Sequence, residues 1–375
     1  MTPDEIIYAM ALTRVHGLSL MNAHLLYEKA SGAQEVWDHR KDLRAIVPDA
    51  GDKLVALFQN EQVMREALAR AQTEWDFVQA KHIRCIPMGD PDYPTLLLEC
   101  PDAPLVLYWL GRGSLNRPHM VSMVGTRKIT QYGKDLCASF VRDLAIACPD
   151  TLVVSGLAYG VDIHCHKAAL DNGLDTLAVL AHGLDTIYPA LHRPTAIKMI
   201  RQGGLLTEYM SDTNADKGNF VRRNRIVAGM SQNIIVVESG SKGGALITAE
   251  LAGEYAHEVY AFPGRVNDEY SQGCNNLIAK EKAHLIGGIE DFLRITGWAS
   301  VEEKPKNQQK DLFLDLPEDE MAVYNALKGV DEKEINRIVI DTAIPYPRVM
   351  AAITELELKG LAEMLGGARY RLRKF

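Results

Sequence analysis

Three glycine-rich turns each separate a short apolar run, typical of a buried strand, from a helical pattern. They span residues 125–127, 155–160 and 240–244. Glycine lets the backbone approach a ligand oxygen closely, and a helix start offers unpaired N–H groups at the positive end of the helix dipole. Because glycine turns occur in many strand–helix proteins, one alone would indicate little. Three together favour an anionic ligand over a purely structural role.

Hydroxyl and basic side chains accompany these turns. Thr126, Ser155 and Thr248 could donate hydrogen bonds to ligand oxygens. The segment 217–225 has four cations and no acidic residue, and Phe220 lies within it. Guanidinium groups suit phosphates and aromatic faces suit bases, so this segment indicates a single-stranded nucleic acid. A charge run is more often a solvated helix face, but Asn224, between two arginines before a buried helix, is an odd place for one.

Two common nucleotide-binding loops are missing from the sequence. No GxxxxGK[ST] occurs, which disfavours ATP hydrolysis of the P-loop kind. No strand is followed by GxGxxG and an acidic residue about 20 positions later, so NAD binding is poorly supported. The phosphates held by the turns therefore belong to a nucleic-acid backbone or a mononucleotide, and we expect no cofactor.

The run His164-Cys165-His166 could suggest a metal site, but its spacing argues against one. Side chains two positions apart on a helix point to different sides, so the two histidines do not share a face. We expect His166 to support the second turn. Asp162 is expected to cap the helix after that turn rather than to act in catalysis.

Composition excludes several protein classes. The net charge is −8, so any nucleic-acid binding must come from local patches. The six cysteines are scattered without a CxxC pair, which argues against a disulfide framework and fits a reducing cytosol. No signal peptide and no run of 18 apolar residues is evident. We therefore expect a cytoplasmic protein without a membrane span.

The elements that position the turns form an alternating strand–helix pattern. Strands are expected at 120–124, 152–154, 176–180, 234–237 and 259–262, and helices at 131–147, 162–171 and from about 245. Short apolar runs ending in glycine and followed by helices predict an α/β domain with a mostly parallel, doubly wound sheet. Ligands of such sheets bind at the carboxyl ends of the strands, where the three turns lie.

Flanking segments predict further domains. Residues 1–70 indicate a small helical domain of the SAM or helix-hairpin-helix kind. A packing role is favoured over DNA contact because its loop at residues 16–19 is not basic. Residues 71–297 form the α/β domain, and the polar segment 298–315 is a linker. Residues 316–375 contain three helices and a hairpin near 366–367, the pattern of a winged helix with a basic tail.

At this point the sequence resembles the DprA/Smf family of bacterial DNA-processing proteins. The resemblance rests on GTR at 125–127, VVSGLAYGVDIHCHKAAL at 153–170, AVLAHGLDTIYP at 178–189, NFVRRNRIVAG at 219–229, GALITAELA at 244–252 and GCNNLI at 273–278. It covers about residues 120–290. It implies an extended Rossmann-like domain that dimerises and binds single-stranded DNA without catalysis. It also implies loading of the recombinase RecA onto incoming strands during natural transformation, with displacement of single-strand-binding protein.

The family motifs assign candidate DNA contacts to positions in the three turns and the basic segment. The candidates are Gly125, Thr126, Arg127, Ser155, Gly156, Gly160, Phe220, Arg223, Asn224, Arg225, Gly244 and Thr248. The sequence departs from the family pattern at Val221, where a proline is usual, and at Ala245, where a serine is frequent.

Two alternatives remain open. Gly243-Gly244 followed by Thr248 and Glu250 faintly resembles the catalytic loop of lysine-decarboxylase-like phosphoribohydrolases, although the spacing is stretched and the proline is absent. The alternative function is therefore a nucleotide-cleaving enzyme. The winged helix could instead bind duplex DNA, but its helix near residues 333–337 carries mixed charge, so protein or dimer contacts are equally consistent with it.

Overall fold

The structure, a computed structural model, describes residues 1–298, 316–330, 332–365 and 367–373. The chain divides into two compact units, Met1–Glu302 and Glu303–Phe375. All but the first residue of the segment predicted to be a linker, 298–315, lies outside the described residues, as does Lys374 of the predicted basic tail. Each unit has its own buried core.

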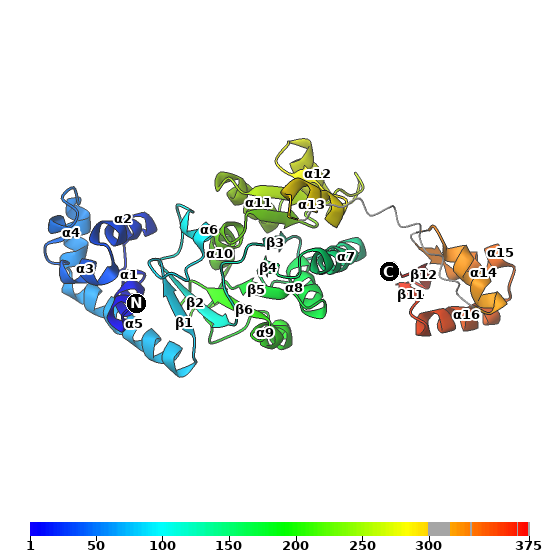
Figure 1. Cartoon of the computed structure of the whole chain (residues 1–375), viewed down its shortest axis with the longest axis horizontal. Coiled ribbons are helices and arrows are strands. Elements are labelled where there is room, and N and C mark those ends of the chain that lie inside the picture. The colour runs from blue at the N-terminus through cyan, green and yellow to red at the C-terminus, as the bar shows by residue number, and fades with distance from the viewer. Residues whose placement is uncertain (299–315, 331, 366, 374–375) are drawn as a thin grey trace. The chain divides into compact units, whose positions relative to one another are not determined.

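The first unit begins with a cluster of helices (Figure 1). They are α1 (Pro3–Leu12), α2 (Leu20–Ala30), α3 (Ala33–Asp38), the 3₁₀ turn η1 (Leu43–Ala45), α4 (Asp52–Gln59) and α5 (Glu61–Ala80). Thr2 and Ser19 cap α1 and α2 by accepting hydrogen bonds from backbone N–H groups of the first turns. Helix α5 continues through residue 70, where we predicted the domain boundary, so the helical cluster and the sheet domain share one long helix.

A single sheet forms the centre of the first unit. Its strands are β1 (Arg84–Pro87), β2 (Val106–Gly111), β3 (Met120–Val124), β4 (Leu152–Ser155), β5 (Asp175–Val179), β6 (Gly203–Thr207), β7 (Asn233–Val236), β8 (Glu258–Ala261) and β9 (His284–Leu285). The order is β1-β2-β6-β5-β4-β3-β7-β8-β9. Strands β3 to β9 pair in parallel, whereas β2 is antiparallel to both β1 and β6. The predicted mostly parallel sheet is confirmed.

Helices cover both faces of this sheet. One face carries α7 (Gln131–Ala147), α8 (Val161–Asp171), α9 (Arg193–Met199) and α13 (Ile289–Thr296), and the other α10 (Lys217–Gly229) and α11 (Gly244–Glu254). Side chains of β3 alternate between the two cores: Val121 and Met123 pack with α7 and α8, and Met120 and Val124 join the opposite core. This is the period-2 pattern of a strand buried on both faces.

The strand order reverses beside β3. The chain adds β4, β5 and β6 on one side of β3 and then returns to place β7, β8 and β9 on the other. The carboxyl ends of β3 and β7 therefore diverge into loops that lead to opposite faces of the sheet. Such a topological switch point is where open α/β sheets bind their ligands.

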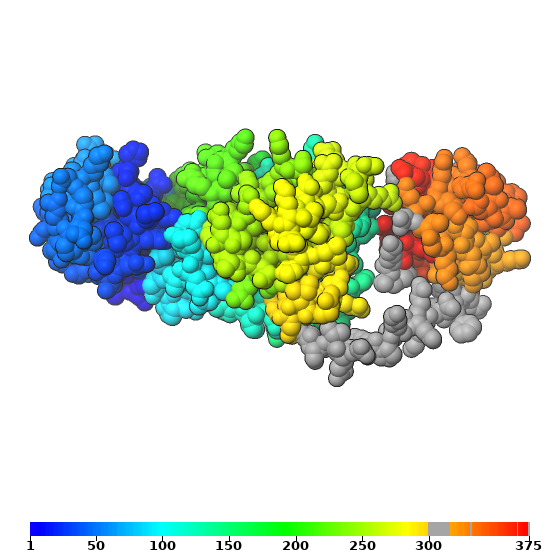
Figure 2. Space-filling view, turned by 90° about the horizontal axis from the view of Figure 1, so that it is seen from above, coloured from blue at the N-terminus to red at the C-terminus, as the bar shows by residue number. Residues whose placement is uncertain are grey.

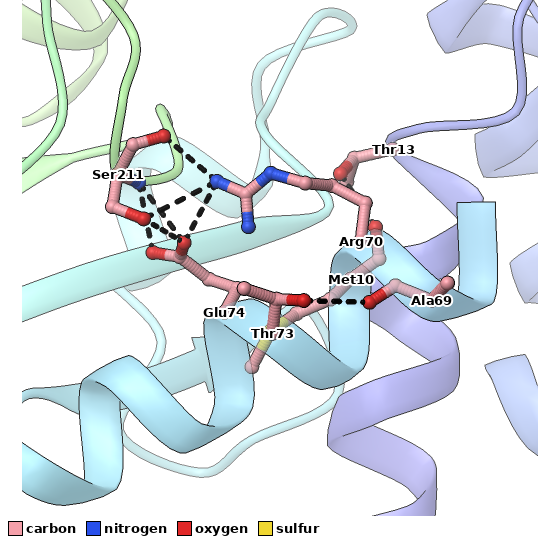
Figure 3. A network of polar contacts seen from close by, with 7 residues as sticks. All are labelled: Met10, Thr13, Ala69, Arg70, Thr73, Glu74 and Ser211. Atoms are coloured by element: carbon pink, nitrogen blue, oxygen red, sulfur yellow. Dashed lines mark hydrogen bonds and ion pairs between the residues drawn. The ribbon is translucent and has the colours of Figure 1, made fainter. Parts of the chain in front are cut away.

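A buried polar network joins the helical cluster to the sheet domain (Figure 3). The carboxylate of Glu74 on α5 accepts hydrogen bonds from the N–H of Ser211, at 2.9 and 3.0 Å, and from its hydroxyl at 2.5 Å. The guanidinium of Arg70 donates to Glu74 at 2.9 Å and to the Ser211 carbonyl at 2.7 Å. Space-filling atoms of the two regions are in direct contact (Figure 2). The network holds the loop between β6 and α10.

The second unit is a winged helix, as predicted. It contains α14 (Glu318–Leu327), β10 (Lys333–Glu334), α15 (Ile335–Thr342), α16 (Tyr346–Leu358), β11 (Ala362–Leu365) and β12 (Arg369–Leu372). The strands form a small sheet in the order β10-β12-β11. Val323, Ile338, Val349 and Leu356 are fully buried in its core. In the parts of both units that the structure describes, no helix is long and apolar enough to cross a membrane.

Candidate functional site

A cavity of about 750 Å³ opens at the switch point of the sheet. The turns after β3, β4 and β7 and the first half of α10 line it. Its lining includes Gly125, Thr126, Arg127, Gly156, Asp162, Tyr188, Lys217, Phe220, Arg223, Asn224, Lys242, Gly244 and Thr248. The three glycine-rich turns predicted from the sequence therefore meet at one site.

The first turn is fixed by its neighbours. The N–H of Thr126 donates to the Glu238 carbonyl at 2.7 Å, and the Thr126 carbonyl accepts from the Val161 N–H at 3.2 Å. A Cβ on Gly125 would lie 2.3 Å from a methyl of Val161, so only glycine fits there. The buried Glu238 carboxylate also accepts from the N–H of Thr130 at 2.8 Å. These bonds leave Arg127 exposed at the mouth of the cavity.

The second turn contributes backbone rather than side-chain hydroxyls. Ser155 is fully buried, and its hydroxyl donates to the Met123 carbonyl at 2.6 Å, so it does not line the cavity. Gly160 has a φ of +78°, and a Cβ there would lie 2.1 Å from the Thr126 carbonyl oxygen. Gly160 therefore lets the second turn pass against the first. Gly156 lines the cavity itself.

A buried charge pair lies beneath the cavity. Arg223 is 4% exposed and donates from Nη1 to the carbonyl oxygens of Gly156, at 2.7 Å, and Val179. Burial raises the pKa of Asp162, while Arg223 and the Ala158 N–H oppose that rise. Burial likewise lowers the pKa of Arg223, and Asp162 opposes this. Arg223 thus holds the second turn in place, and Asp162 lies close enough to offset part of its charge.

An aromatic and cationic cluster forms one wall. The Arg127 guanidinium lies over the Phe220 ring at 4.8 Å from its centroid, and that of Arg223 at 6.0 Å. The Tyr188 ring lies 5.7 Å from that of Phe220 and is 47% exposed. A cation that lies over the face of an aromatic ring is attracted to that ring. The wall therefore offers both a positive charge and planar rings to a ligand.

The third turn brings the start of α11 to the cavity. No side chain caps this helix, whose first residue is Gly244. Asn224 reaches across from α10 and donates from Nδ2 to the Gly244 carbonyl at 3.4 Å. Thr248 is 2% exposed, and its hydroxyl donates to the same carbonyl at 3.2 Å. The uncapped N-terminus directs backbone N–H groups and partial positive charge to this side.

Arg225, like Ser155 and Gly160, is a predicted contact that does not line the cavity. Its guanidinium forms an ion pair with Glu208, and the two side chains are 11% and 17% exposed. Burial raises the pKa of Glu208, and the charge of Arg225 opposes that rise most strongly. Arg225 lies two residues after Arg223 on α10 and therefore faces a different environment. Both arginines were predicted to contact DNA, because the sequence alone does not show which face of the helix each residue occupies.

Two residues of the site were missed by the prediction. Tyr188 precedes a cis proline in a loop that carries no strand or helix signal. Glu238 ends an apolar run and has no obvious partner in the sequence. A buried carboxylate needs hydrogen-bond donors, and its position directly after a strand that ends at the site was the available signal.

The histidine run behaves differently from a metal site. The structure describes no group of three or more His, Cys, Asp or Glu side chains arranged to hold a metal. His166 is fully buried and its Nδ1 lies 2.7 Å from the Thr176 hydroxyl, on β5 rather than on the second turn. Burial lowers the pKa of His166 to about 3. The expectation that His166 supports the second turn is therefore replaced by support of the sheet.

Known proteins match the chain along most of its length. Residues 84–297 match the family model described as DNA recombination-mediator protein A, and residues 308–368 match the DprA winged helix domain. Protein Smf of Escherichia coli is 34% identical over 298 residues, which are 77% of each chain. The chain belongs to the DprA/Smf family. The family resemblance stated from the motifs is confirmed, and with it a place among DNA-processing proteins.

Two solved structures of DprA/Smf proteins are similar to this chain. DNA processing protein A from Streptococcus pneumoniae matches 78% of this chain and 98% of its own, with 29% identity and a TM-score of 0.63. DNA processing protein A from Helicobacter pylori, a structure concerned with its single-stranded DNA binding mode, matches 57% of this chain and 95% of its own, with 30% identity and a TM-score of 0.52.

The alternative of a nucleotide-cleaving enzyme gains no support from the geometry. Its required carboxylate is Glu250, which is exposed and lies 3.6 Å from the amine of Lys282. Glu250 lines a separate depression beside α11 and not the switch-point cavity. A glutamate in that place does not reach a ligand held by the three turns.

Proposed function

We propose that the switch-point cavity binds single-stranded DNA. One observation carries the proposal: Phe220, with Arg127 over its ring at 4.8 Å, stands in a cavity where three glycine turns converge. Guanidinium groups suit phosphates, whereas exposed rings stack on bases of any sequence. The wall continues outward to the exposed Tyr188, which a site for a single mononucleotide would not require.

The predicted contact residues divide into two groups under this proposal. Residues proposed to touch the strand are Gly125, Thr126, Arg127, Gly156, Phe220, Asn224 and Gly244. Residues proposed to act by holding those in place are Ser155, Gly160, Arg223, Arg225 and Thr248. The division follows burial and hydrogen bonding, because a side chain already committed to backbone carbonyls or a buried carboxylate has little left to offer a phosphate.

The family supports a wider role in recombination. We propose that the protein is a non-catalytic mediator that acts as a homodimer in the cytoplasm and loads RecA onto incoming single strands during natural transformation. Single-strand-binding protein would be displaced in this step. The proposal draws on the family description as a recombination mediator and on the single-stranded DNA binding of the Helicobacter pylori relative. RecA filament growth on strands precoated with single-strand-binding protein tests it, and equal growth with and without this protein would contradict it.

Single-strand binding is tested by fluorescence anisotropy with a labelled oligo-dT and a duplex of equal length. We expect the single strand to bind more tightly. Phe220→Leu should weaken oligo-dT binding roughly ten-fold, because loss of one stacking contact costs about 1–3 kcal/mol. Phe77→Leu on α5, which is also half-buried, is the matched control. Equal affinity of the parent and Phe220→Leu would remove the support for this site.

A further inference from the structure

A second groove, with a volume of about 700 Å³, adjoins the cavity and shares Arg127 with it. It lies between the amino-terminal part of α7, one face of α8, and α9. Four lysines line it: Lys128, Lys134, Lys167 and Lys198. None of the lining residues is a carboxylate, although the chain as a whole carries a net charge of −8. We call this feature the lysine groove.

The positive charge of the lysine groove meets no ion-pairing partner among the described residues. Lys128, Lys167 and Lys198 are exposed and Lys134 is half-buried. Among the ion pairs of the residues that the structure describes, none involves these four lysines. Like charges gathered on one surface repel each other and raise the local concentration of anions. An anionic partner would relieve this repulsion.

The lysine charges act on His164 at the floor of the groove. His164 lies there and its ring Nδ1–H donates to the Gly160 carbonyl at 2.8 Å. Burial lowers the pKa of His164, the Gly160 hydrogen bond opposes this, and the charges of Lys134 and Lys167 lower it further. The positive potential of the groove therefore comes from its four amines and the shared guanidinium of Arg127.

An exposed aromatic ring connects the groove to the cavity. Tyr159 lines the groove, is 45% exposed and stands edge-on to His192 at 5.0 Å. The positive φ of Gly160 brings the following backbone against Arg127, where a Cβ would lie 2.7 Å from the Arg127 carbonyl carbon. Arg127 is thus placed with Phe220 on one side and the groove containing Tyr159 on the other. Aromatic rings and cations therefore extend from the cavity into the lysine groove.

We propose that the lysine groove is a second segment of the nucleic-acid path, which holds the phosphates of a single strand that leaves the cavity over Arg127. This inference rests on the proposed single-strand binding by the cavity. A polynucleotide matches both features of the groove, since its phosphates pair with the amines and its bases stack on Tyr159. An acidic polypeptide would use the amines and leave the exposed ring without a role.

The experiment compares a short and a long strand in anisotropy titrations at several salt concentrations. The variant is Lys134→Ala/Lys167→Ala/Lys198→Ala. The control is Lys29→Ala/Lys53→Ala/Lys81→Ala, which removes the same charge from exposed positions of the helical cluster. The probes are labelled dT6, of a length near the lower end of single-strand sites, and labelled dT20. We expect the groove variant to bind dT6 like the parent and dT20 on the order of ten-fold more weakly, with a salt slope reduced by about 2 for three lost phosphate contacts.

Each other outcome decides the matter. Equal binding of dT20 by the groove variant and the control variant overturns the lysine groove as part of the path. An equal loss for dT6 and dT20 also overturns it, because the effect would not depend on strand length. A loss confined to duplex DNA of 20 base pairs would assign the groove to a double strand instead and contradict the proposal. Phe220→Leu separates the two proposals: if it binds dT6 like the parent, single-strand binding by the cavity fails, whatever the groove does.

Discussion

Arg223 and Arg225 lie two positions apart on α10 and meet different surroundings. Arg223 donates to two backbone carbonyls under the cavity, whereas Arg225 pairs with the largely buried Glu208. Arg127, by contrast, is exposed and stacked on Phe220. At the scale of residues, the cations near the cavity therefore divide into those that build the site and those that remain available to a ligand.

Arg225→Ala should destabilise the protein, and its affinity for oligo-dT should fall much less than that of Arg127→Ala. The substitution would leave the buried Glu208 carboxylate without its partner, and removing one member of such a pair costs about 3 kcal/mol or more. Urea unfolding followed by tryptophan fluorescence measures the loss. Arg222→Ala, at the exposed neighbouring position, is the control. A stable Arg225→Ala variant with weakened DNA binding would place Arg225 in the site after all.

His166 should make stability depend on pH in the acid range. Because burial holds its pKa at about 3, below the ordinary value of 6.5, His166 is neutral in the folded state while the unfolded chain takes up a proton below pH 6.5. This stability contribution is complete above pH 6.5 and is lost as pH falls towards 3. From this group alone we expect a loss on the order of 3 kcal/mol between pH 7 and pH 4.

His166→Gln tests this dependence, because glutamine does not titrate. The difference in unfolding free energy between pH 7 and pH 4.5 should be smaller in His166→Gln than in the parent, whatever the variant's stability at neutral pH. His16→Gln, at an exposed position, controls for the loss of a histidine. Parallel curves for the parent and His166→Gln would show that His166 is protonated or accessible in the folded protein.

At the scale of elements, α5 links the helical cluster to the loop that precedes α10. Glu74 is 1% exposed, and its oxygens take hydrogen bonds from the N–H and hydroxyl of Ser211. Helix α10 starts six residues beyond Ser211, at Lys217, and carries Phe220. The network in Figure 3 therefore fixes the approach to the cationic wall of the cavity.

Glu74→Gln should lower the unfolding free energy by about 3 kcal/mol, since it takes the charged partner from Arg70 and one of two buried acceptor oxygens from Ser211. Chemical denaturation of the variant measures this. Glu66→Gln lies on the exposed side of the same helix and should have little effect. If the two variants unfold at the same denaturant concentration, the network does not stabilise the junction.

The sequence predicts the positions of most strands and turns better than the way the strands pair. Strands β3, β4, β5, β7 and β8 were located to within one or two residues because continuous apolar runs end there in glycine. Strand β6 was not predicted, because Gly203 and Gly204 weaken its apolar signal. The antiparallel pairing of β1 and β2 depends on contacts between distant segments. The same holds for the site. The sequence predicted which positions lie in the turns, but whether the side chains of Ser155 and Arg225 point into the cavity or away from it depends on the packing of the folded chain.

At the scale of the whole molecule, the two units have separate cores. The four tryptophans, Trp37, Trp75, Trp109 and Trp298, all belong to the first unit, so their fluorescence reports on that unit alone. Ile338→Ala removes a fully buried side chain from the core of the second unit. We expect a loss of about 2–5 kcal/mol there.

Amide hydrogen exchange should therefore accelerate in α14, α15 and α16 of Ile338→Ala, while the thermal transition followed by tryptophan fluorescence stays where it is in the parent. A parallel shift of the tryptophan transition would show that the units unfold together. Val154→Ala, in the core of the first unit, is the converse control and should shift that transition.

DNA binding at the switch-point cavity is tested by the salt dependence of oligo-dT binding by the parent and by Arg127→Ala. Arg127 is exposed at the mouth of the cavity, so its loss should not disturb the fold. We expect weaker binding at every salt concentration and a slope of log K against log salt that is less negative by about 0.7, the value for one lost phosphate contact on a single strand. Identical affinity and slope in the two proteins would contradict the claim that the switch-point cavity holds the DNA backbone.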